Sequence, residues 1–297
     1  MSEPSSNRLD PRAVRRSFDR AAVRYERHAG LQREVADELL ERLAGVRIDP
    51  RRVVDLGCGP GHAAHALVRM YRRATVYGVD FAPAMVRRLR RGWWPRGRPL
   101  PVCADVRRLP FDDASVDLLF SNLTFQWIDD LPALFAELRR VLRPEGVLMF
   151  SSFGPDTLSE LRAAWAAVDE GEHVNRFPDM HDVGDALLGA GLRDPVMDVD
   201  RQSRDYDDLR ALMRAIKAIG AGNAAAARPR GLTGRGVMQR LESAYPARSG
   251  DGRPLASWEV VYGHAWGAAI PRPGSGDAGE FAVPLDAIGG LRKRRGD

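Results

Sequence analysis

Along most of the chain, short apolar runs alternate with longer segments in which apolar residues recur every three or four positions. The runs have the length and the β-branched content of buried strands, whereas the three-to-four spacing is typical of amphipathic helices. The pattern predicts strands at 53–56, 75–80, 100–106, 116–123, 146–153, 196–199 and 258–266. It predicts one or two helices within 12–44 and further helices at 63–70, 83–89, 131–142, 156–169, 179–190 and 206–219.

Strands that alternate with helices of this length form βαβ units, so we expect an α/β fold with a parallel sheet covered by helices on both faces. Beyond residue 154 the alternation loosens, and a Gly/Ala/Arg-rich loop is expected before the last strand. The run PRPGSGDAGE, from residue 271, is typical of a linker, and the final LRKRRGD of a disordered basic tail. We therefore expect a single domain over 12–270, followed by a linker and tail over 271–297.

Composition adds little to this picture. The 297 residues are 44% hydrophobic and 29% charged, which is ordinary for a globular protein. Two cysteines, Cys58 and Cys103, argue against a disulfide scaffold and fit a reducing compartment. No apolar stretch approaches the roughly 18 residues that a membrane span needs, and the polar N-terminus is not typical of a signal peptide. We expect a cytoplasmic protein without a membrane partner.

The charge is unusual in kind rather than in amount. The formal net charge is +5, yet 43 of the 45 cationic residues are arginine, the exceptions being Lys217 and Lys293. A nucleic-acid-binding protein would need a recognition motif beside its basic residues, and we find none. The densest arginine cluster, within 87–108, fits a solvated face or a surface that docks an acidic partner.

A glycine-rich loop is the clearest chemical signal. Gly57, Gly59 and Gly61 follow a predicted strand and precede a predicted helix, the context in which backbone N–H groups approach a ligand closely. The spacing is not that of a dinucleotide fingerprint, and no Lys-Ser/Thr pair follows as in a phosphate-binding P-loop. Asp55, two residues before the first glycine, suits a cationic or amine-bearing ligand better than a diphosphate. The histidines have no metal-ligand spacing, so no metal is expected.

Residues 55–61 (DLGCGPG) resemble the first motif of class I S-adenosylmethionine-dependent methyltransferases, and three further features follow in order. Asp80 closes the second strand, Asp105 follows the third, and residues 143–148 (RPEGVL) resemble the turn into the fifth. The resemblance implies a Rossmann-like, mostly parallel seven-stranded sheet. It also implies that Asp80 accepts both ribose hydroxyls and that Asp105 meets the adenine amino group. The cofactor residues that it implies are Asp55, Gly57, Gly59, Gly61, Asp80, Phe81, Met85, Asp105, Val106 and Asn122.

Longer stretches are similar to one subfamily, the malonyl-[acyl-carrier protein] O-methyltransferases of biotin synthesis. They are residues 17–32, 121–127, 164–177 and 213–221. This resemblance implies lid helices over 12–45, a cofactor-binding core over 50–153, and a substrate-side insertion with the last strands over 154–270. It implies methyl transfer from S-adenosylmethionine to the free carboxylate of a malonyl thioester, giving the methyl ester that primes pimeloyl formation. Because that carboxylate is already ionised at neutral pH, no general base is required.

The same resemblance nominates substrate-positioning residues. They are Tyr25, Gln126, Asn175, Arg176, Phe177 and Lys217. Each also has an ordinary structural interpretation: Tyr25 as a residue of an amphipathic face, Arg176 as one surface arginine among many, and Phe177 as core. Lys217 is notable because a lysine that persists among so many arginines suggests a need for a compact ammonium.

Two other functions stay open from the sequence. One is a small-molecule methyltransferase with a different acceptor, such as a quinone ring carbon or another carboxylate. The other is a respiratory-complex assembly factor related to the same subfamily. The expected partner is malonyl-acyl carrier protein or malonyl-CoA, and the expected oligomeric state is a monomer.

Overall fold

The computed structural model describes residues 9–89, 97–223 and 234–268. The tail expected over 271–297, as well as Arg90, Arg91 and Arg96 of the arginine cluster, lies outside these ranges. Seven strands form one sheet in the order β3-β2-β1-β4-β5-β7-β6. Strands β1 to β5 pair in parallel, and β7 runs antiparallel to both β5 and β6. The strands are β1 (Arg52–Leu56), β2 (Thr75–Asp80), β3 (Leu100–Cys103), β4 (Val116–Asn122), β5 (Leu142–Phe153), β6 (Arg193–Asp205) and β7 (Leu255–Trp266).

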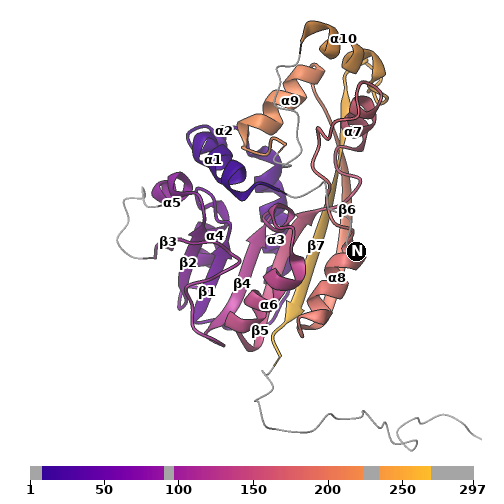
Figure 1. Ribbon diagram of the computed structural model, residues 1–297. Helices are drawn as coiled ribbons and strands as arrows, with labels where there is room; N and C mark the ends of the chain where they lie inside the picture. Colours follow the sequence, from indigo (N-terminus) through magenta and orange to yellow (C-terminus); the bar gives the residue numbers. More distant parts are fainter. Residues whose placement is uncertain (1–8, 90–96, 224–233, 269–297) are drawn as a thin grey trace, which may run out of the picture.

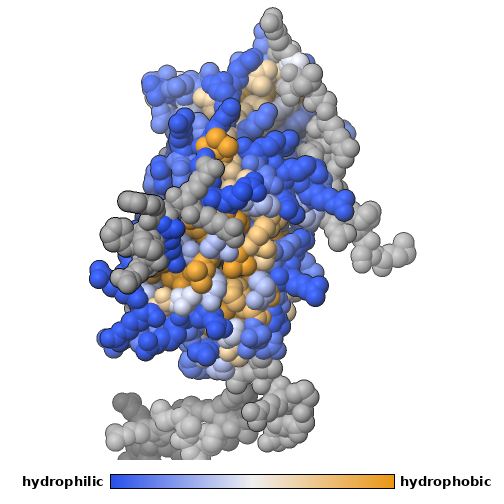
Figure 2. Space-filling model, turned by 90° about the vertical axis from the view of Figure 1, so that its left-hand side faces the viewer, coloured by the Kyte–Doolittle hydropathy of each residue, from blue (hydrophilic) through white to orange (hydrophobic). Residues whose placement is uncertain are grey.

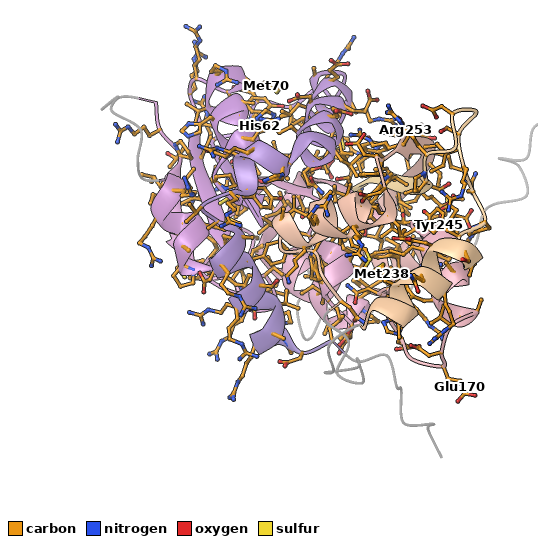
Figure 3. All side chains as sticks on the ribbon, turned by 90° about the horizontal axis from the view of Figure 1, so that it is seen from above. His62, Met70, Glu170, Met238, Tyr245 and Arg253 are labelled. Atoms are coloured by element: carbon orange, nitrogen blue, oxygen red, sulfur yellow. The ribbon has the colours of Figure 1, made fainter. Side chains whose placement is uncertain are left out.

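Helices cover both faces of the sheet and its carboxyl-terminal edge. The helices are α1 (Pro11–Ala21), α2 (Tyr25–His28), α3 (Gly30–Ala44), α4 (His62–Met70), α5 (Pro83–Leu89), η1 (Phe125–Trp127), α6 (Leu131–Val141), α7 (Ser159–Ala166), α8 (Met180–Gly189), α9 (Leu209–Ala218) and α10 (Arg235–Ala244). Figure 1 shows β6 and β7 extending beyond the other strands, with α7, α9 and α10 around that extension. Seen from above, α4 with His62 and Met70 lies well apart from α10 with Met238 (Figure 3).

Alternating residues of the central strands point to opposite faces and bury into two apolar layers. Val53 of β1 joins the layer that contains α3 and α4, whereas its neighbour Val54 joins the layer of α6 and α8. Phe120 and Leu119 of β4 divide in the same way. Because both faces are covered, the strands are continuous apolar runs, and this is why the sequence pattern identified them. The mostly parallel seven-stranded sheet of a class I methyltransferase is confirmed.

The N-terminal segment was predicted as one or two helices, and that prediction is wrong: it folds as three. The chain turns between α1 and α2 and again at Ala29, whose backbone leaves the helical region. Neither glycine nor proline stands at the first turn, so no local signal marks it. The turn is set by packing, because α1 lies against α5 while α3 packs on α4 and β5.

Other elements also differ from the prediction; β5 and β7 begin at Leu142 and Leu255 and not at residues 146 and 258. Strand β3 ends at Cys103 rather than at residue 106, because Asp105 bends the chain by accepting the Arg107 backbone N–H at 3.0 Å. Strand β6 is 13 residues long instead of four, since its polar residues lie on an exposed edge strand. Helix α10 lies where a loop was expected and buries Leu241 completely.

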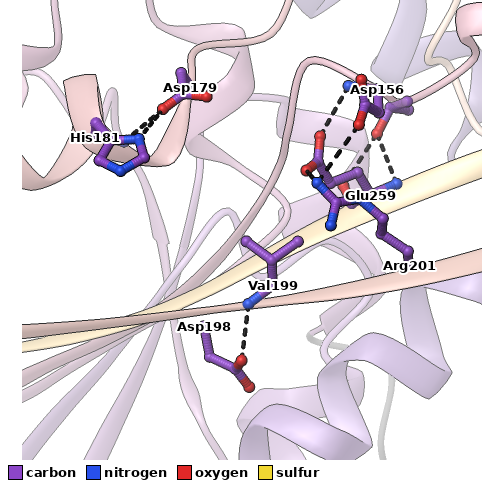
Figure 4. Close-up of polar contacts among 8 residues, drawn as sticks. Asp156, Asp179, His181, Asp198, Val199, Arg201 and Glu259 are labelled. Atoms are coloured by element: carbon purple, nitrogen blue, oxygen red, sulfur yellow. Dashed lines mark hydrogen bonds and ion pairs between the residues drawn. The ribbon is translucent and has the colours of Figure 1, made fainter.

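The long β6–β7 pair is fastened to the chain after β5 by a buried carboxylate. Glu259 of β7, 4% exposed, accepts the Asp156 backbone N–H at 2.8 Å and lies 2.9 Å from the Arg201 guanidinium of β6 (Figure 4). A buried carboxylate needs such partners because its desolvation is costly. The contact therefore fixes the extension of the sheet against the segment that leads into α7.

Candidate functional site

The glycine-rich loop joins β1 to α4 at the carboxyl-terminal edge of the sheet. Gly57 has φ +69°, and a Cβ there would lie 2.0 Å from the Thr124 hydroxyl oxygen, so only glycine fits. Thr124, on the chain after β4, holds this position by donating to the Leu56 carbonyl at 3.2 Å. The loop backbone is therefore packed tightly on one side and faces Tyr25 of the lid at Gly59.

Asp80 ends β2 directly beside this loop. Its two carboxylate oxygens accept the Gly59 backbone N–H at 3.0 Å and the Ala82 backbone N–H at 2.8 Å. Burial raises the pKa of Asp80 to about 6 despite these two hydrogen bonds. The carboxylate is thus held rigidly, and each of its oxygens keeps a lone pair for a ligand hydroxyl.

Two buried oxygens near the loop have no hydrogen-bond partner among the described residues. They are Asp55 Oδ2, in a residue 2% exposed, and Gln32 Oε1, in a residue 8% exposed. Burial raises the pKa of Asp55 well above its usual range, opposed by the Ala64 backbone N–H, and Asp80 adds its negative charge. Neither Asp55 nor Asp80 has an ion-pair partner within the described part of the chain. Such a site favours a ligand that brings hydrogen-bond donors and positive charge.

Two adjoining cavities meet at the glycine loop and share Tyr25, Gly57, Gly59 and Asn122. The first, about 730 Å³ including space open to solvent, is lined in addition by residues of the Asp80 side: Phe81, Met85, Asp105, Val106, Arg107, Thr124 and Trp127 among them. The second, about 1390 Å³ on the same measure, is lined in addition by residues of the Asp55 side: Gln32, Arg33, Cys58, Gly61, His65 and Arg88 among them. All ten cofactor residues predicted from the sequence line one or both cavities.

Asp105 lines the first cavity but already has a partner there. The Arg107 guanidinium binds both of its carboxylate oxygens, at 2.9 and 2.5 Å. Partial burial would raise the pKa of Asp105, yet the hydrogen bonds from Arg107 lower it below its usual value. The structure thus presents an ion pair where the sequence suggested a free carboxylate.

The first helix closes the first cavity from above. Phe18 of α1 packs edge-on against Trp127 and Phe81, with ring centroids 5.3 and 6.4 Å apart. Asp19 accepts the Ala84 backbone N–H of α5 at 2.9 Å, and the Arg88 guanidinium donates to the Val23 carbonyl at 2.9 Å. Figure 2 shows the side of the molecule that lies to the left in Figure 1, with apolar surface at its centre between hydrophilic rims. These contacts therefore hold helix α1 in place over the first cavity.

Tyr25 begins α2 and lines both cavities from the lid side. Burial, together with the negative charge of Asp80, raises the pKa of its hydroxyl, which is therefore neutral at physiological pH. Tyr25 is partly buried, as expected for a residue of an amphipathic face, and it lies over the glycine loop, as expected for a residue of a lid. Both interpretations therefore agree with its position.

A third cavity lies on the opposite side of α1, with a volume of about 1480 Å³ including open space. It brings together three of the predicted substrate residues, Asn175, Phe177 and Lys217. Asn175 is buried, whereas Lys217 of α9 is exposed at the rim. One wall is a stacked pair, Trp165 and His173, whose ring centroids are 3.6 Å apart.

Two predicted substrate residues lie outside these three cavities. The Arg176 side chain is 69% exposed and lies 3.3 Å from Glu172, in a separate hollow formed by residues 162–176. Gln126 of η1 is buried, and its carbonyl oxygen has no partner. Asn175 and Phe177 line the third cavity whereas Arg176 lines the separate hollow, so neighbours in the sequence motif face different sides.

Sequence reasoning missed several residues of the site. Gln32, Arg33 and Phe18 come from the lid helices, where helical spacing identified only an apolar face. Thr124 lies inside the stretch 121–127, and Phe18 and Gln32 lie inside 17–32, so the resemblance covered them without singling them out. Arg107 belongs to a loop without such a motif. A polar residue such as Gln32 on the buried face of α3 was a further signal.

Within residues 9–89, 97–223 and 234–268, the structure holds no group of three or more histidine, cysteine or acidic side chains placed to bind a metal ion. Over the same ranges, no helix combines the length and the apolar character required to cross a bilayer.

Comparison with known proteins gives a consistent result. A family model described as a methyltransferase domain matches residues 54–150. A malonyl-[acyl-carrier protein] O-methyltransferase from Halorhodospira halophila is 52% identical, covering 99% of this chain and 100% of that protein. One of the same name from Laribacter hongkongensis is 50% identical and covers 89% and 92%. Among solved structures, the YcgJ protein from Bacillus subtilis has a TM-score of 0.56 at 17% identity, covering 79% of this chain and 99% of that one, which is a likeness of fold.

Proposed function

Since the chain belongs to the malonyl-[acyl-carrier protein] O-methyltransferases, we propose that it methylates the free carboxylate of a malonyl thioester carried by acyl carrier protein. S-adenosylmethionine is the methyl donor, and the methyl ester primes the pimeloyl chain in biotin biosynthesis. The observation that carries the proposal is the pair of buried acids at the glycine loop, Asp55 and Asp80, which form no ion pair within the residues that the structure describes.

The cofactor fits these residues. Its ribose hydroxyls would bind the oxygens of Asp80, which two backbone N–H groups hold in place. Its ammonium group would meet Asp55 Oδ2 and Gln32 Oε1, the two unpartnered buried oxygens. Its adenine amino group would approach Asp105, beside Arg107. The glycines, together with Phe81, Met85, Val106 and Asn122, would form the walls.

The reaction requires little acid–base catalysis by the protein. When bound, S-adenosylmethionine supplies an electrophilic methyl group on a positively charged sulfur. A carboxylate is ionised at neutral pH, so the chain needs only to desolvate it, aim it and exclude water. Tyr25, Phe18 and Trp127 close the first cavity and suit this last task.

On the substrate side we assign Asn175, Phe177 and Lys217 to binding of the carrier-bound substrate, because all three line the third cavity. Arg176 and Gln126 do not line it, so their predicted substrate contact has no support from the geometry. We further propose that residues 12–270 act as one domain and that the enzyme works as a monomer without nucleic acid or membrane.

The proposal is tested by incubating the purified protein with labelled S-adenosylmethionine and malonyl-acyl carrier protein. We expect a base-labile methyl ester on the malonyl group, detected by mass spectrometry, and the same ester at a lower rate with malonyl-CoA. Strong methylation of a quinone or of a respiratory-complex protein, without transfer to malonyl thioesters, would overturn the proposal. Acetyl-acyl carrier protein, which lacks the free carboxylate, is the matched control.

A further inference from the structure

Helix α1 presents opposite faces to two cavities. Val14 and Phe18 line the first cavity, over Asp80. Arg16 and Arg20 line the third cavity, together with Ala13 and Ser17. This division follows the helical repeat, because residues three or four apart share a face. One helix is therefore the common wall of the cofactor cavity and the substrate-side cavity.

The third cavity combines an apolar interior with a cationic rim. Its interior includes Leu161, Trp165, Phe177, Met213 and Ile216. Its cations are Arg16, Arg20 and Lys217, and the described residues that line it include no aspartate or glutamate. Such a lining suits an elongated ligand that is largely uncharged along its length and anionic where it leaves the cavity.

The cations of the rim are available to a ligand. Arg20 and Lys217 are exposed and form no ion pair within the described ranges. Arg16 has a single distant partner, the Asp10 carboxylate at 3.9 Å, and its side chain is 61% exposed. Elsewhere on this surface some arginines are engaged, as Arg107 is with Asp105 and Arg88 with the Val23 carbonyl, whereas others, such as Arg15, form no ion pair within the described residues. What distinguishes this opening is that three exposed cations line one cavity whose described lining contains no acidic side chain.

We propose that the third cavity receives the phosphopantetheine arm of the carrier, and that Arg16, Arg20 and Lys217 bind its phosphate at the rim. The inference rests on the proposed function, because that function supplies a thioester on such an arm. Guanidinium groups bind phosphate oxygens through paired hydrogen bonds, and an ammonium adds a compact charge. The uncharged part of the arm would run along the apolar interior, past Asn175.

The test compares two small substrates that differ only in the phosphate, malonyl-phosphopantetheine and malonyl-pantetheine. The measured quantity is the ratio of their kcat/KM values, which isolates the phosphate from the methyl-transfer step. In the wild type we expect the phosphorylated substrate to be preferred. In the double variant Arg16→Gln/Arg20→Gln the ratio should fall about tenfold or more, the effect expected for loss of charged hydrogen bonds.

Arg15→Gln is the matched control, because Arg15 is an exposed arginine of the same helix that lines none of the three cavities. It should keep the wild-type ratio. A wild type that methylates the two thioesters equally well or equally poorly, or a double variant with an unchanged ratio, overturns the inference. Absence of transfer to malonyl-acyl carrier protein itself would instead remove the proposed function, so the two failures are distinguishable.

Discussion

Gln32 Oε1 is a buried acceptor without a donor, which is costly in the free protein. Leaving such a group unpaired costs about 1–3 kcal/mol, and natural proteins retain it where a ligand supplies the missing donor. Asp55 Oδ2 is likewise a buried acceptor without a donor among the described residues, and Asp55 lines the same cavity as Gln32. The two residues come from α3 and from the end of β1, so the lid and the sheet each contribute one acceptor.

We expect Gln32→Leu to have opposite effects on folding and on binding. The free energy of unfolding of the unliganded protein should rise by about 1 kcal/mol, because an unsatisfied buried oxygen is removed. Affinity for S-adenosylhomocysteine should fall about tenfold, because its ammonium loses an acceptor. Thermal denaturation and calorimetric titration measure the two quantities. Gln126→Leu removes a similar unpartnered oxygen away from the cofactor cavities, and a tenfold loss of affinity there as well would refute this assignment.

Asp80 predicts a pH dependence. Its pKa of about 6 lies above the value of 3.8 for an unperturbed aspartate. A carboxyl group whose pKa rises on folding stabilises the fold most below its unfolded pKa, and this contribution is lost as the pH rises through about 6. Between pH 4 and 7 the unliganded wild type should lose up to about 3 kcal/mol of stability relative to Asp80→Asn.

Binding should follow the opposite trend over the same range. The ionised carboxylate is the better acceptor for ribose hydroxyls, so affinity for S-adenosylhomocysteine should increase with pH in the wild type but not in the variant. Denaturation and titration at a series of pH values test both statements. Parallel stability curves for the two proteins would show that Asp80 does not titrate in this range.

At this scale the residues that the sequence assigned to the cofactor all line the two cavities at the glycine loop, whereas two of those assigned to the substrate lie outside the third cavity; their roles stay predictions. Asp55, Asp80 and the glycines are fixed by backbone geometry at strand ends, which spacing along the chain reports directly. The directions of the Arg176 and Gln126 side chains depend on the tertiary packing of an irregular segment and of the short helix η1, and the sequence pattern carries no information on that. Lys217 lies exposed at a rim, where no described contact requires lysine in place of arginine.

Helix α1 lines two cavities of the site, and specific contacts hold it in place. Asp19 reaches across to the first turn of α5 and accepts a backbone N–H that the helix leaves unpaired. The Phe18 ring adds contacts with Trp127 and Phe81. The lid is thereby tied to the same helix that contributes Met85 to the cofactor cavity.

We expect Asp19→Ala to loosen the lid without unfolding the protein. Loss of this acceptor should cost about 1 kcal/mol, as for other helix N-terminal caps. Backbone amides of α1 should exchange with solvent faster, and cofactor affinity should fall several-fold. Hydrogen exchange followed by mass spectrometry measures the first effect and titration the second. Arg15→Ala, on the solvent side of the same helix, should change neither, and equal exchange rates in wild type and Asp19→Ala would contradict the prediction.

Elements that are buried on both faces or that form amphipathic helices were predictable, because their pattern reflects burial. Strands β1, β4 and β5 and helices α4 and α6 belong to this group. The turn between α1 and α2 was not predictable, since it results from packing on α5 and not from a helix-breaking residue. The length of edge strand β6 was underestimated because most of its side chains are exposed to solvent, where polar residues carry no desolvation cost.

The whole molecule carries a net charge of +5, almost all of its cations being arginine. Such a charge accelerates encounter with an acidic partner, an effect that salt screens. Within segment 87–108, Arg107 binds Asp105 and Arg88 binds the Val23 carbonyl of the lid. Both are therefore less available to a partner than Arg20 of the third cavity.

We therefore expect activity on the malonyl-carrier protein to depend on salt. Between about 50 and 300 mM NaCl, kcat/KM should fall about threefold to tenfold, because charge screening weakens the encounter. Activity on malonyl-pantetheine, which lacks phosphate and protein, should change little and serves as the control. A salt response of equal size for both substrates would indicate an effect on the enzyme itself.

The position of α1 between two cavities has a thermodynamic consequence. To the extent that a bound molecule restricts the remaining motion of this helix, the first to bind bears that entropic cost, and the second binds to a wall already ordered. Linkage makes the benefit mutual: if the cofactor tightens attachment of the arm, the arm tightens retention of the cofactor by the same factor. After the reaction the same coupling means that each bound product slows the dissociation of the other. The helix that closes the site would thus also slow the departure of the first product and ease that of the second.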